Sequence, residues 1–227
     1  MSVVVNHLGV RLELDPKVLS EKMIESIKAG RYENVEAREI AKIIQPNEVI
    51  VEIGAGLGFI ATLAAKHEHT VRIVSYEANP KLIAHITKTL ETNTDKSRKN
   101  WEVRNAVLQN GSDQETMPFY VHNDFWASSL LPIKDPASVE QVKVENFNAM
   151  LRDIKPSMII CDIEGGELDL FRHADLSGVK KVYMEIHQNR LGRRKIRDLF
   201  QIFHARDFHY DQHHSHGSVV MFSHVDR

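Results

Sequence analysis

The sequence contains one cysteine, Cys161, among 227 residues, so no disulfide can form within the chain. No apolar run approaches the roughly 18 residues that a membrane-spanning helix needs, and no basic leader precedes an apolar stretch at the N-terminus. Neither sign of charge is in large excess, because 29 Lys and Arg face 31 Asp and Glu, for a net charge of −2. These absences predict a cytoplasmic protein without a membrane span, for which nucleic acid is a disfavoured partner.

Proline and glycine are also scarce, at 7 and 11 residues, and no stretch rich in them forms a linker. No internal repeat or low-complexity tract is visible either. We therefore expect a single domain. Residues 1–45 should form a hairpin and two helices that pack on a core of residues 46–227.

The hydrophobic pattern of the core alternates between short apolar runs and segments of helical periodicity. This alternation predicts a doubly wound α/β fold with a mostly parallel, seven-stranded sheet and an antiparallel C-terminal hairpin. The expected strands are 49–53, 71–76, 101–107, 158–161, 179–186, 208–210 and 219–222, with helices at 17–29, 35–44, 59–66, 80–90 and 193–203. Residues 110–145 interrupt the rhythm and are expected to form an irregular insertion over the edge of the sheet.

A glycine-rich loop follows the first core strand and opens a helix. It contains Gly54, Ala55, Gly56 and Gly58. Glycine allows tight turns and close approach of the backbone to a ligand, and the free N–H groups of the helix start face the same place. The G-x-G-x-G spacing differs from the G-x-G-x-x-G of dinucleotide-binding loops. With Glu52 just before it, the loop favours a cofactor that carries a cationic amino group and a sulfonium.

A second cofactor contact is expected at the end of the next strand. Glu77 is followed there by Ala78 and Asn79, and a carboxylate in this position can accept hydrogen bonds from both hydroxyls of a ribose. Asn105 and Ala106 end the third strand. They either contact the adenine end of the cofactor or simply terminate the strand.

Acidic residues and a histidine follow two further strands. Asp162 and Glu164 come after the fourth strand, and Glu185 and His187 after the fifth. Ligands of doubly wound sheets bind beyond the carboxyl ends of the strands, so these side chains should converge there. In one version His187 or Asp162 is the general base and the two glutamates orient the acceptor. In the other, Asp162 and Glu185, with Glu164 or His187, hold a magnesium ion. We commit to no metal.

The combined motifs resemble class I S-adenosylmethionine-dependent methyltransferases, and among them the FkbM family. The resemblance rests on Tyr32-Glu33, residues 52–55, 77–80, 105–107 and 184–187, and above all on the Asp-x-Glu-Gly-x-Glu signature of residues 162–167. It implies a seven-stranded enzyme that uses S-adenosylmethionine to methylate a hydroxyl of a sugar, glycoconjugate or natural product. The expected partner is a small-molecule or glycan acceptor. The oligomeric state is left open, with a homodimer as one possibility.

The same resemblance suggests acceptor contacts for Tyr32, Ser128, Ser129 and Glu167. Glu167 has a second interpretation as the start of a helix, where the helix dipole favours an acid. An N-methyltransferase acting on an amine or macromolecule is the alternative enzyme, and a cofactor-binding regulatory or scaffolding subunit is the non-enzymatic one.

A basic cluster occupies one of the expected helices. It consists of Arg190, Arg193, Arg194, Lys195 and Arg197. Such a cluster fits an exposed, solvated helix face or contacts with an anionic group such as phosphate.

Overall fold

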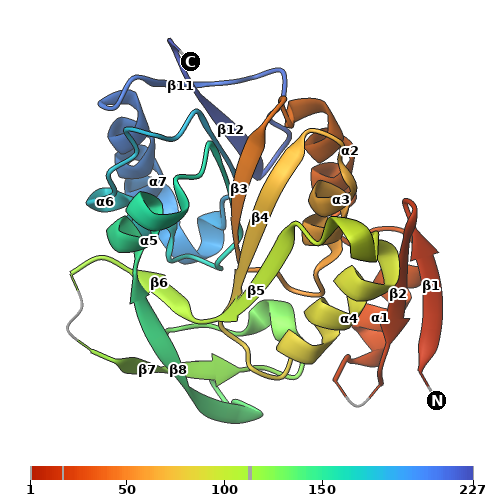
Figure 1. Ribbon diagram of the computed structural model, residues 1–227. Coiled ribbons are helices and arrows are strands. Elements are labelled where there is room, and N and C mark those ends of the chain that lie inside the picture. Colours follow the sequence, from red (N-terminus) through yellow and green to blue (C-terminus); the bar gives the residue numbers. More distant parts are fainter. Residues whose placement is uncertain (1, 17, 112–113, 227) are drawn as a thin grey trace.

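A seven-stranded sheet forms the centre of the computed structural model, which describes residues 2–16, 18–111 and 114–226 (Figure 1). Its strand order is β11-β12-β10-β9-β3-β4-β5. The strands are β3 (Glu48–Ile53), β4 (Thr70–Glu77), β5 (Trp101–Asn105), β9 (Met158–Cys161), β10 (Lys181–Glu185), β11 (Phe208–Tyr210) and β12 (Val219–His224). Only the pairings of β12 are antiparallel. The predicted fold class is confirmed.

Helices cover both faces of this sheet (Figure 1). One layer contains α2 (Asn34–Ile43), α3 (Phe59–Lys66) and α4 (Ile83–Asn93), and the other contains α5 (Phe147–Ile154), α6 (Glu167–Arg172) and α7 (Gln188–His204). Successive residues of β3 pack against opposite helix layers, since Ile50 lies in one hydrophobic cluster and Val51 in the other. None of the helices in the described ranges is long and apolar enough to cross a membrane.

The N-terminal elements pack against α3 and α4. They are β1 (Val3–His7), β2 (Val10–Leu14) and α1 (Glu21–Lys28). α1 starts later than predicted because the Ser20 hydroxyl caps it by accepting from the Met23 N–H at 3.3 Å; Lys17, in the predicted start, lies outside the described residues. The His7 ring stacks on Phe59 and lies 2.9 Å from the Tyr32 carbonyl through Nε2. This packing fixes the chain that leads into α2.

The prediction of an irregular insertion over residues 110–145 is wrong. The main sheet ends at Asn105, and the expected strand 101–107 is split. Its last part belongs to a second sheet of β6 (Val107–Gln109), β8 (Ser138–Asn146) and β7 (Thr116–Val121). Val107, Phe119 and Val142 give this sheet a core of its own, which explains its regular pairing. α5 follows it, begun by an Asn146 cap, and was not predicted.

The predicted helix 193–203 is longer and bent. α7 starts at Gln188 and joins two helices across Gly192, whose φ of 74° and ψ of 158° are non-helical. Almost only glycine adopts this backbone region. The second half of α7 therefore begins anew at Arg193.

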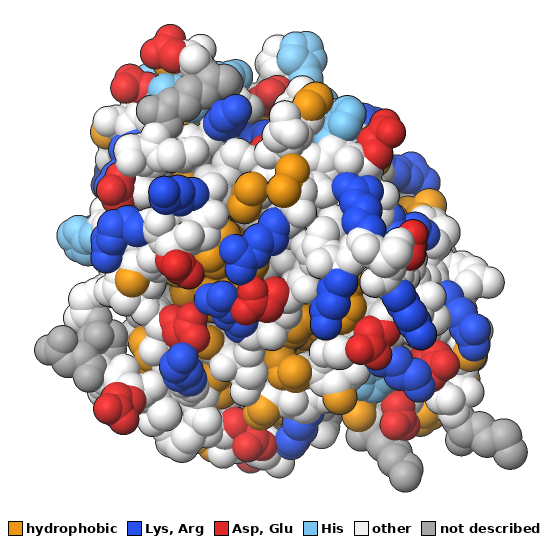
Figure 2. Space-filling view, in the orientation of Figure 1, with side chains coloured by type: hydrophobic (Ala, Val, Ile, Leu, Met, Phe, Trp, Pro, Cys, Tyr) orange, Lys and Arg blue, Asp and Glu red, His pale blue; other side chains and the backbone are white. Residues whose placement is uncertain are grey.

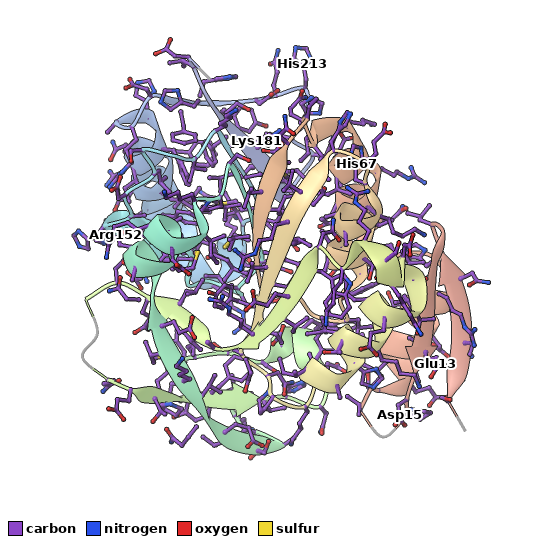
Figure 3. The ribbon with its side chains drawn as sticks, viewed as in Figure 1. Glu13, Asp15, His67, Arg152, Lys181 and His213 are labelled. Atoms are coloured by element: carbon purple, nitrogen blue, oxygen red, sulfur yellow. The ribbon has the colours of Figure 1, made fainter. Side chains whose placement is uncertain are left out.

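A buried ion pair lies at the amino ends of the strands, where Figure 3 labels Lys181. Lys181 Nζ lies 2.6 Å from Glu48 Oε2, and the two side chains are 8% and 2% exposed. Lys181 also donates to the Ile43 carbonyl, and the Ser157 hydroxyl donates to Glu48. The end of α2 and strands β3, β9 and β10 are thereby joined at one point.

Replacement of Lys181 by Ala should lower the free energy of unfolding by about 3–5 kcal/mol, because Glu48 is left as an uncompensated buried charge. The control is Arg72→Ala, which removes a half-exposed pair with Glu102 and should cost about 1 kcal/mol or less. Urea unfolding at pH 7 measures both. Equal losses in the two variants would contradict the role assigned to Lys181.

Candidate active site

A cavity of about 770 Å³ opens at the carboxyl ends of the parallel strands. It gathers residues from most of the segments singled out in the sequence. The predicted residues that line it are Tyr32, Gly54, Gly56, Glu77, Ala78, Ala106, Ser128, Asp162, Glu164, Glu185 and His187. Seven other predicted residues do not line it, namely Glu52, Ala55, Gly58, Asn79, Asn105, Ser129 and Glu167.

Two glycines of the loop are needed for different structural reasons. Gly54 has a φ of 89°, and a Cβ added there would lie 1.8 Å from the Asp162 carbonyl oxygen. Any side chain would push apart the two strand ends that form the cavity floor. Gly58 also has a positive φ, but its added Cβ would meet Ile86 of α4 at 2.9 Å. Gly58 therefore permits close packing of α3 on α4 and is not a cavity residue.

Glu77 is held rigidly at the cavity wall. Its carboxylate accepts from the Gly56 N–H at 2.9 Å and the Asn79 N–H at 2.7 Å. Burial raises the pKa of Glu77 to about 7. Asn105 Nδ2 donates to the carbonyls of Glu77 and Ala78. The structure thus places Asn79 and Asn105 as supports of the Glu77 segment.

A second group of acids surrounds a smaller cavity of about 30 Å³ behind Gly54. Glu52 is 2% exposed, and within the described ranges its Oε2 has no hydrogen-bond partner; the same holds for Glu33 Oε2, Asp162 Oδ1 and the Tyr32 hydroxyl. Burial raises the pKa of Glu52 to about 7 and those of Glu33 and Asp162 well above their ordinary values. Glu52 is buried, whereas the Asp162 side chain is 40% exposed. An unpartnered buried carboxylate is costly, and a cationic ligand would relieve the cost.

Glu33 and Glu36, for which no site role was predicted, both line the two cavities. Glu33 is the N-terminal cap residue of α2 and has a positive φ of 44°. Only the tertiary packing of α2 brings these acids to the ends of the strands. The Tyr32-Glu33 pair ahead of the first core strand was the one available signal.

His187 lies within a cage of carboxylates. Its Nε2 is 3.4 Å from Glu164, 3.7 Å from Asp162 and 3.8 Å from Glu185, and its Nδ1 is 3.6 Å from Glu167. Burial opposes the charged ring, but Glu167 and the other carboxylates outweigh it and raise the pKa of His187 to about 9. The ring is therefore an imidazolium at neutral pH.

Glu167 lies behind this ring and away from the cavity. It is 0% exposed, is the first residue of α6, and accepts from the Gly165 N–H at 3.0 Å. In this position it orients His187 and does not reach an acceptor. The expected acceptor contact of Glu167 does not fit this placement.

Asp162, Glu185 and His187 also offer ligand atoms that all lie within 4.8 Å of one another. This geometry permits the metal alternative. An imidazole ligand suits zinc or another transition metal better than magnesium, which favours oxygen donors.

The remaining wall of the cavity is aromatic. Phe125 and Trp126 of the short helix η2 (Phe125–Ala127) line it, and Phe125 meets Tyr32 edge-on at 6.4 Å between ring centroids. Around the turn that holds η2, the Ser128 hydroxyl accepts from the His122 N–H and the Ser129 hydroxyl accepts from the Leu131 N–H, both at 3.0 Å. Both hydroxyls thus shape the turn, although Ser128 alone of the two lines the cavity.

The donor set fits a cationic, ribose-bearing cofactor. Glu77 stands at the tip of β4, the bare backbone of Gly54 allows close approach, and unpartnered carboxylates lie behind it. Together with the fold, this site defines a class I methyltransferase that depends on S-adenosylmethionine. The protein is therefore an enzyme of this class and not the non-catalytic subunit considered from the sequence.

A family model described as the TRM5/TYW2 methyltransferase domain matches residues 4–146, and the chain belongs to this family. No curated protein shows significant similarity to the sequence.

Solved structures show the same fold at low identity. Trm5b from Pyrococcus abyssi is 13% identical with a TM-score of 0.54, and the match covers 98% of this chain and 55% of that one. TYW2 from M. jannaschii in complex with AdoMet is 14% identical with a TM-score of 0.50, covering 99% and 87%. TYW2 from P. horikoshii in complex with MeSAdo is 12% identical with a TM-score of 0.50, covering 97% and 69%. The chain thus spans about half the length of the Trm5b structure.

The resemblance to the FkbM family is wrong, because the family match is to TRM5/TYW2. The glycine loop and the strand-end acids occur across class I methyltransferases, so they fix the cofactor and not the acceptor. The expected O-methylation of a sugar, glycoconjugate or natural product is wrong with it, as is the expected small-molecule or glycan acceptor.

The expectation that nucleic acid is a disfavoured partner is also wrong. The net charge of the whole chain is a poor guide to the surface, because five acids of the described part are buried against one buried cation, Lys181. These acids are Glu39, Glu48, Glu52, Glu77 and Glu167. The exposed surface is therefore more basic than the formal charge implies, and many Lys and Arg side chains are visible on the face in Figure 2.

Replacement of Glu77 by Ala should weaken S-adenosylmethionine binding by tenfold to several-hundredfold, since each lost charge-assisted hydrogen bond to a ribose hydroxyl contributes about 1.5–3 kcal/mol. Titration calorimetry measures the affinity. Glu102→Ala, a half-exposed acid on the neighbouring strand, should leave it unchanged. Unaltered affinity in Glu77→Ala would refute the ribose contact.

The affinity for S-adenosylmethionine should rise between pH 5.5 and 7. Glu52 and Glu77, with pKa values of about 7 in place of 4.5, are largely neutral at the lower pH, and a cationic ligand favours their ionised forms. Each such ionisation should contribute on the order of a tenfold gain over this range. In Glu52→Gln the slope of log Kd against pH should be shallower. A flat or inverted profile in the unaltered protein would contradict the assignment.

Proposed function

We propose that this enzyme transfers the methyl group of S-adenosylmethionine to a base of an RNA, with tRNA as the RNA class. The membership of residues 4–146 in the TRM5/TYW2 methyltransferase domain family carries the proposal. A cytoplasmic location, expected from the sequence, is part of the same proposal.

The shape of the cavity supports a base as acceptor. Its volume of about 770 Å³ lies in the upper part of the usual range for ligand pockets and leaves room for a second group beside the cofactor. Phe125 and Trp126 form one wall, and proteins that act on RNA bases stack unpaired bases on aromatic rings of this kind. Arg31 also lines the cavity and adds a cation beside these rings.

We assign the cofactor to the side of the cavity formed by β3 and β4. Glu77 would accept from the ribose hydroxyls, the Gly54–Gly56 turn would follow the methionine portion, and Glu52 and Glu33 would face its ammonium group. When bound, S-adenosylmethionine supplies an electrophilic methyl carbon on a sulfonium. The backbone contacts of Glu77 hold its carboxylate in one orientation before the cofactor arrives.

We assign the proton acceptor to Asp162. A base nitrogen that carries hydrogen must release a proton when it is methylated, and His187 is already protonated at neutral pH. Burial raises the pKa of Asp162, and the sulfonium of the bound cofactor would return this carboxylate to its ionised form, in which it can accept the proton. The His187 imidazolium would balance the charge of Glu164 and Glu185 and hold the group in place.

Incubation with methyl-tritiated S-adenosylmethionine tests the proposal. The unaltered protein should label unfractionated tRNA in a form released by ribonuclease. At saturating S-adenosylmethionine, turnover by Asp162→Asn should fall about 10²–10⁴-fold with the loss of the base. Labelling of a glycan panel in place of tRNA, or of neither, would refute an RNA acceptor. Full turnover by Asp162→Asn would remove Asp162 from the proton transfer.

A further inference from the structure

Three adjacent cations occupy the start of the second half of α7. Arg193, Arg194 and Lys195, here called the basic turn, are all exposed. The ion pairs found in the described ranges include none of the three, whereas Arg190 pairs with Glu164 and Arg197 with Asp198. The basic turn therefore presents its charge to solvent.

The position of the basic turn is unfavourable for the helix itself. The non-helical Gly192 makes Arg193 the first residue of a new helical segment, so the three cations lie at the positive end of its dipole. Arg193 also lies four residues before Arg197, a like-charge spacing that destabilises helices. Because Asp198, the acid of this helical segment, pairs with Arg197 and not with the basic turn, a contribution to stability does not explain the cluster.

The basic turn at the start of a helical segment favours the binding of an anion. The first N–H groups of a helix have no partner within it, and they add to the attraction of three neighbouring cations for phosphate.

The basic turn lies next to the candidate active site. Arg190, three residues before it, has its Nε 3.2 Å from Glu164 Oε2, and Glu164 lines the cavity. The Arg190 side chain also packs on Gly165, where an added Cβ would lie 2.9 Å away. The turn is thus anchored at the mouth by the same loop that carries Asp162.

The cavity and its rim differ in charge, because acids outnumber Arg31 and His187 along the cavity lining. Asp162, Glu164 and Glu185 line the interior, which repels phosphate. Cations lie outside it, and Lys22 adds another elsewhere on the rim, with its Nζ 6.0 Å from the centroid of the Trp126 ring. An acidic cavity with a basic rim can admit an uncharged base while the phosphate backbone that carries the base stays at the rim.

We propose that the basic turn binds the phosphodiester backbone of the RNA whose base enters the cavity. The inference rests on the proposed function and adds to it the surface that holds the RNA. Base contacts inside the cavity select the acceptor, and phosphate contacts at the basic turn position the strand.

The test compares two triple charge reversals in the full chain. One is Arg193→Glu, Arg194→Glu and Lys195→Glu. The control is Lys96→Glu, Lys99→Glu and Lys180→Glu, three exposed cations next to the amino ends of β5 and β10, at the opposite end of the sheet. Both change the net charge equally. Affinity for unfractionated tRNA is measured between 50 and 200 mM salt (on the order of physiological ionic strength), alongside cofactor affinity and thermal unfolding.

The basic-turn variant should bind tRNA at least tenfold more weakly, and its log–log salt slope should be shallower by about two, since about 0.7 counterion is released per phosphate contact. Cofactor affinity should not change, and the melting temperature should hold or rise because acids suit a helix start. The control should keep the slope of the unaltered protein.

Two results would overturn the inference. They are an unchanged slope in the basic-turn variant, or equal weakening in both variants. If tRNA is methylated yet the slope is unchanged, the RNA-methylation proposal stands and the basic turn is not its docking surface. If tRNA binds through the basic turn but receives no methyl group, the surface stands and the proposed reaction is refuted.

Discussion

The organising constraint of this protein is the burial of carboxylates that it does not neutralise by itself. Glu33, Glu52 and Asp162 line the cavity behind the glycine loop. One carboxylate oxygen of each has no hydrogen-bond partner in the described part of the chain, although His187 Nε2 lies 3.7 Å from that of Asp162. Burial raises their pKa values, so the cofactor-free site is partly neutral and poised to ionise. A sulfonium and an ammonium on one ligand supply the missing charge. The site therefore selects the donor because the fold gathers more negative than positive side chains there.

The two ends of the sheet treat buried charge in opposite ways. At the amino ends, Glu48 is paired with Lys181 and bonded to Ser157, so the charge joins the strands. At the carboxyl ends, the acids outnumber the cations, and His187 offsets only part of their charge. Stability and function are therefore separated along the strands, as is usual for doubly wound sheets.

The sequence alone predicted the main sheet and most of the residues at its functional edge. Parallel strands end at one edge, so residues following them, such as Glu77, Asp162 and His187, could be grouped without coordinates. Glu33 and Glu36 were missed because the packing of α2, and no strand, brings them to the site. The small sheet β6-β8-β7 was missed because β6 has only three residues and pairs with β8 across a long sequence separation. The acceptor was mispredicted because motifs that bind the shared donor do not describe the acceptor.

Calorimetric titration of the free protein with S-adenosylmethionine at pH 6, in buffers of different ionisation enthalpy, tests the central claim most directly. Glu52 and Glu77, with pKa values of about 7, are mostly protonated at this pH. Binding should therefore release between about one and two protons into the buffer. Binding with no proton exchange, or with net uptake, would show that the buried acids do not supply the charge that holds the donor.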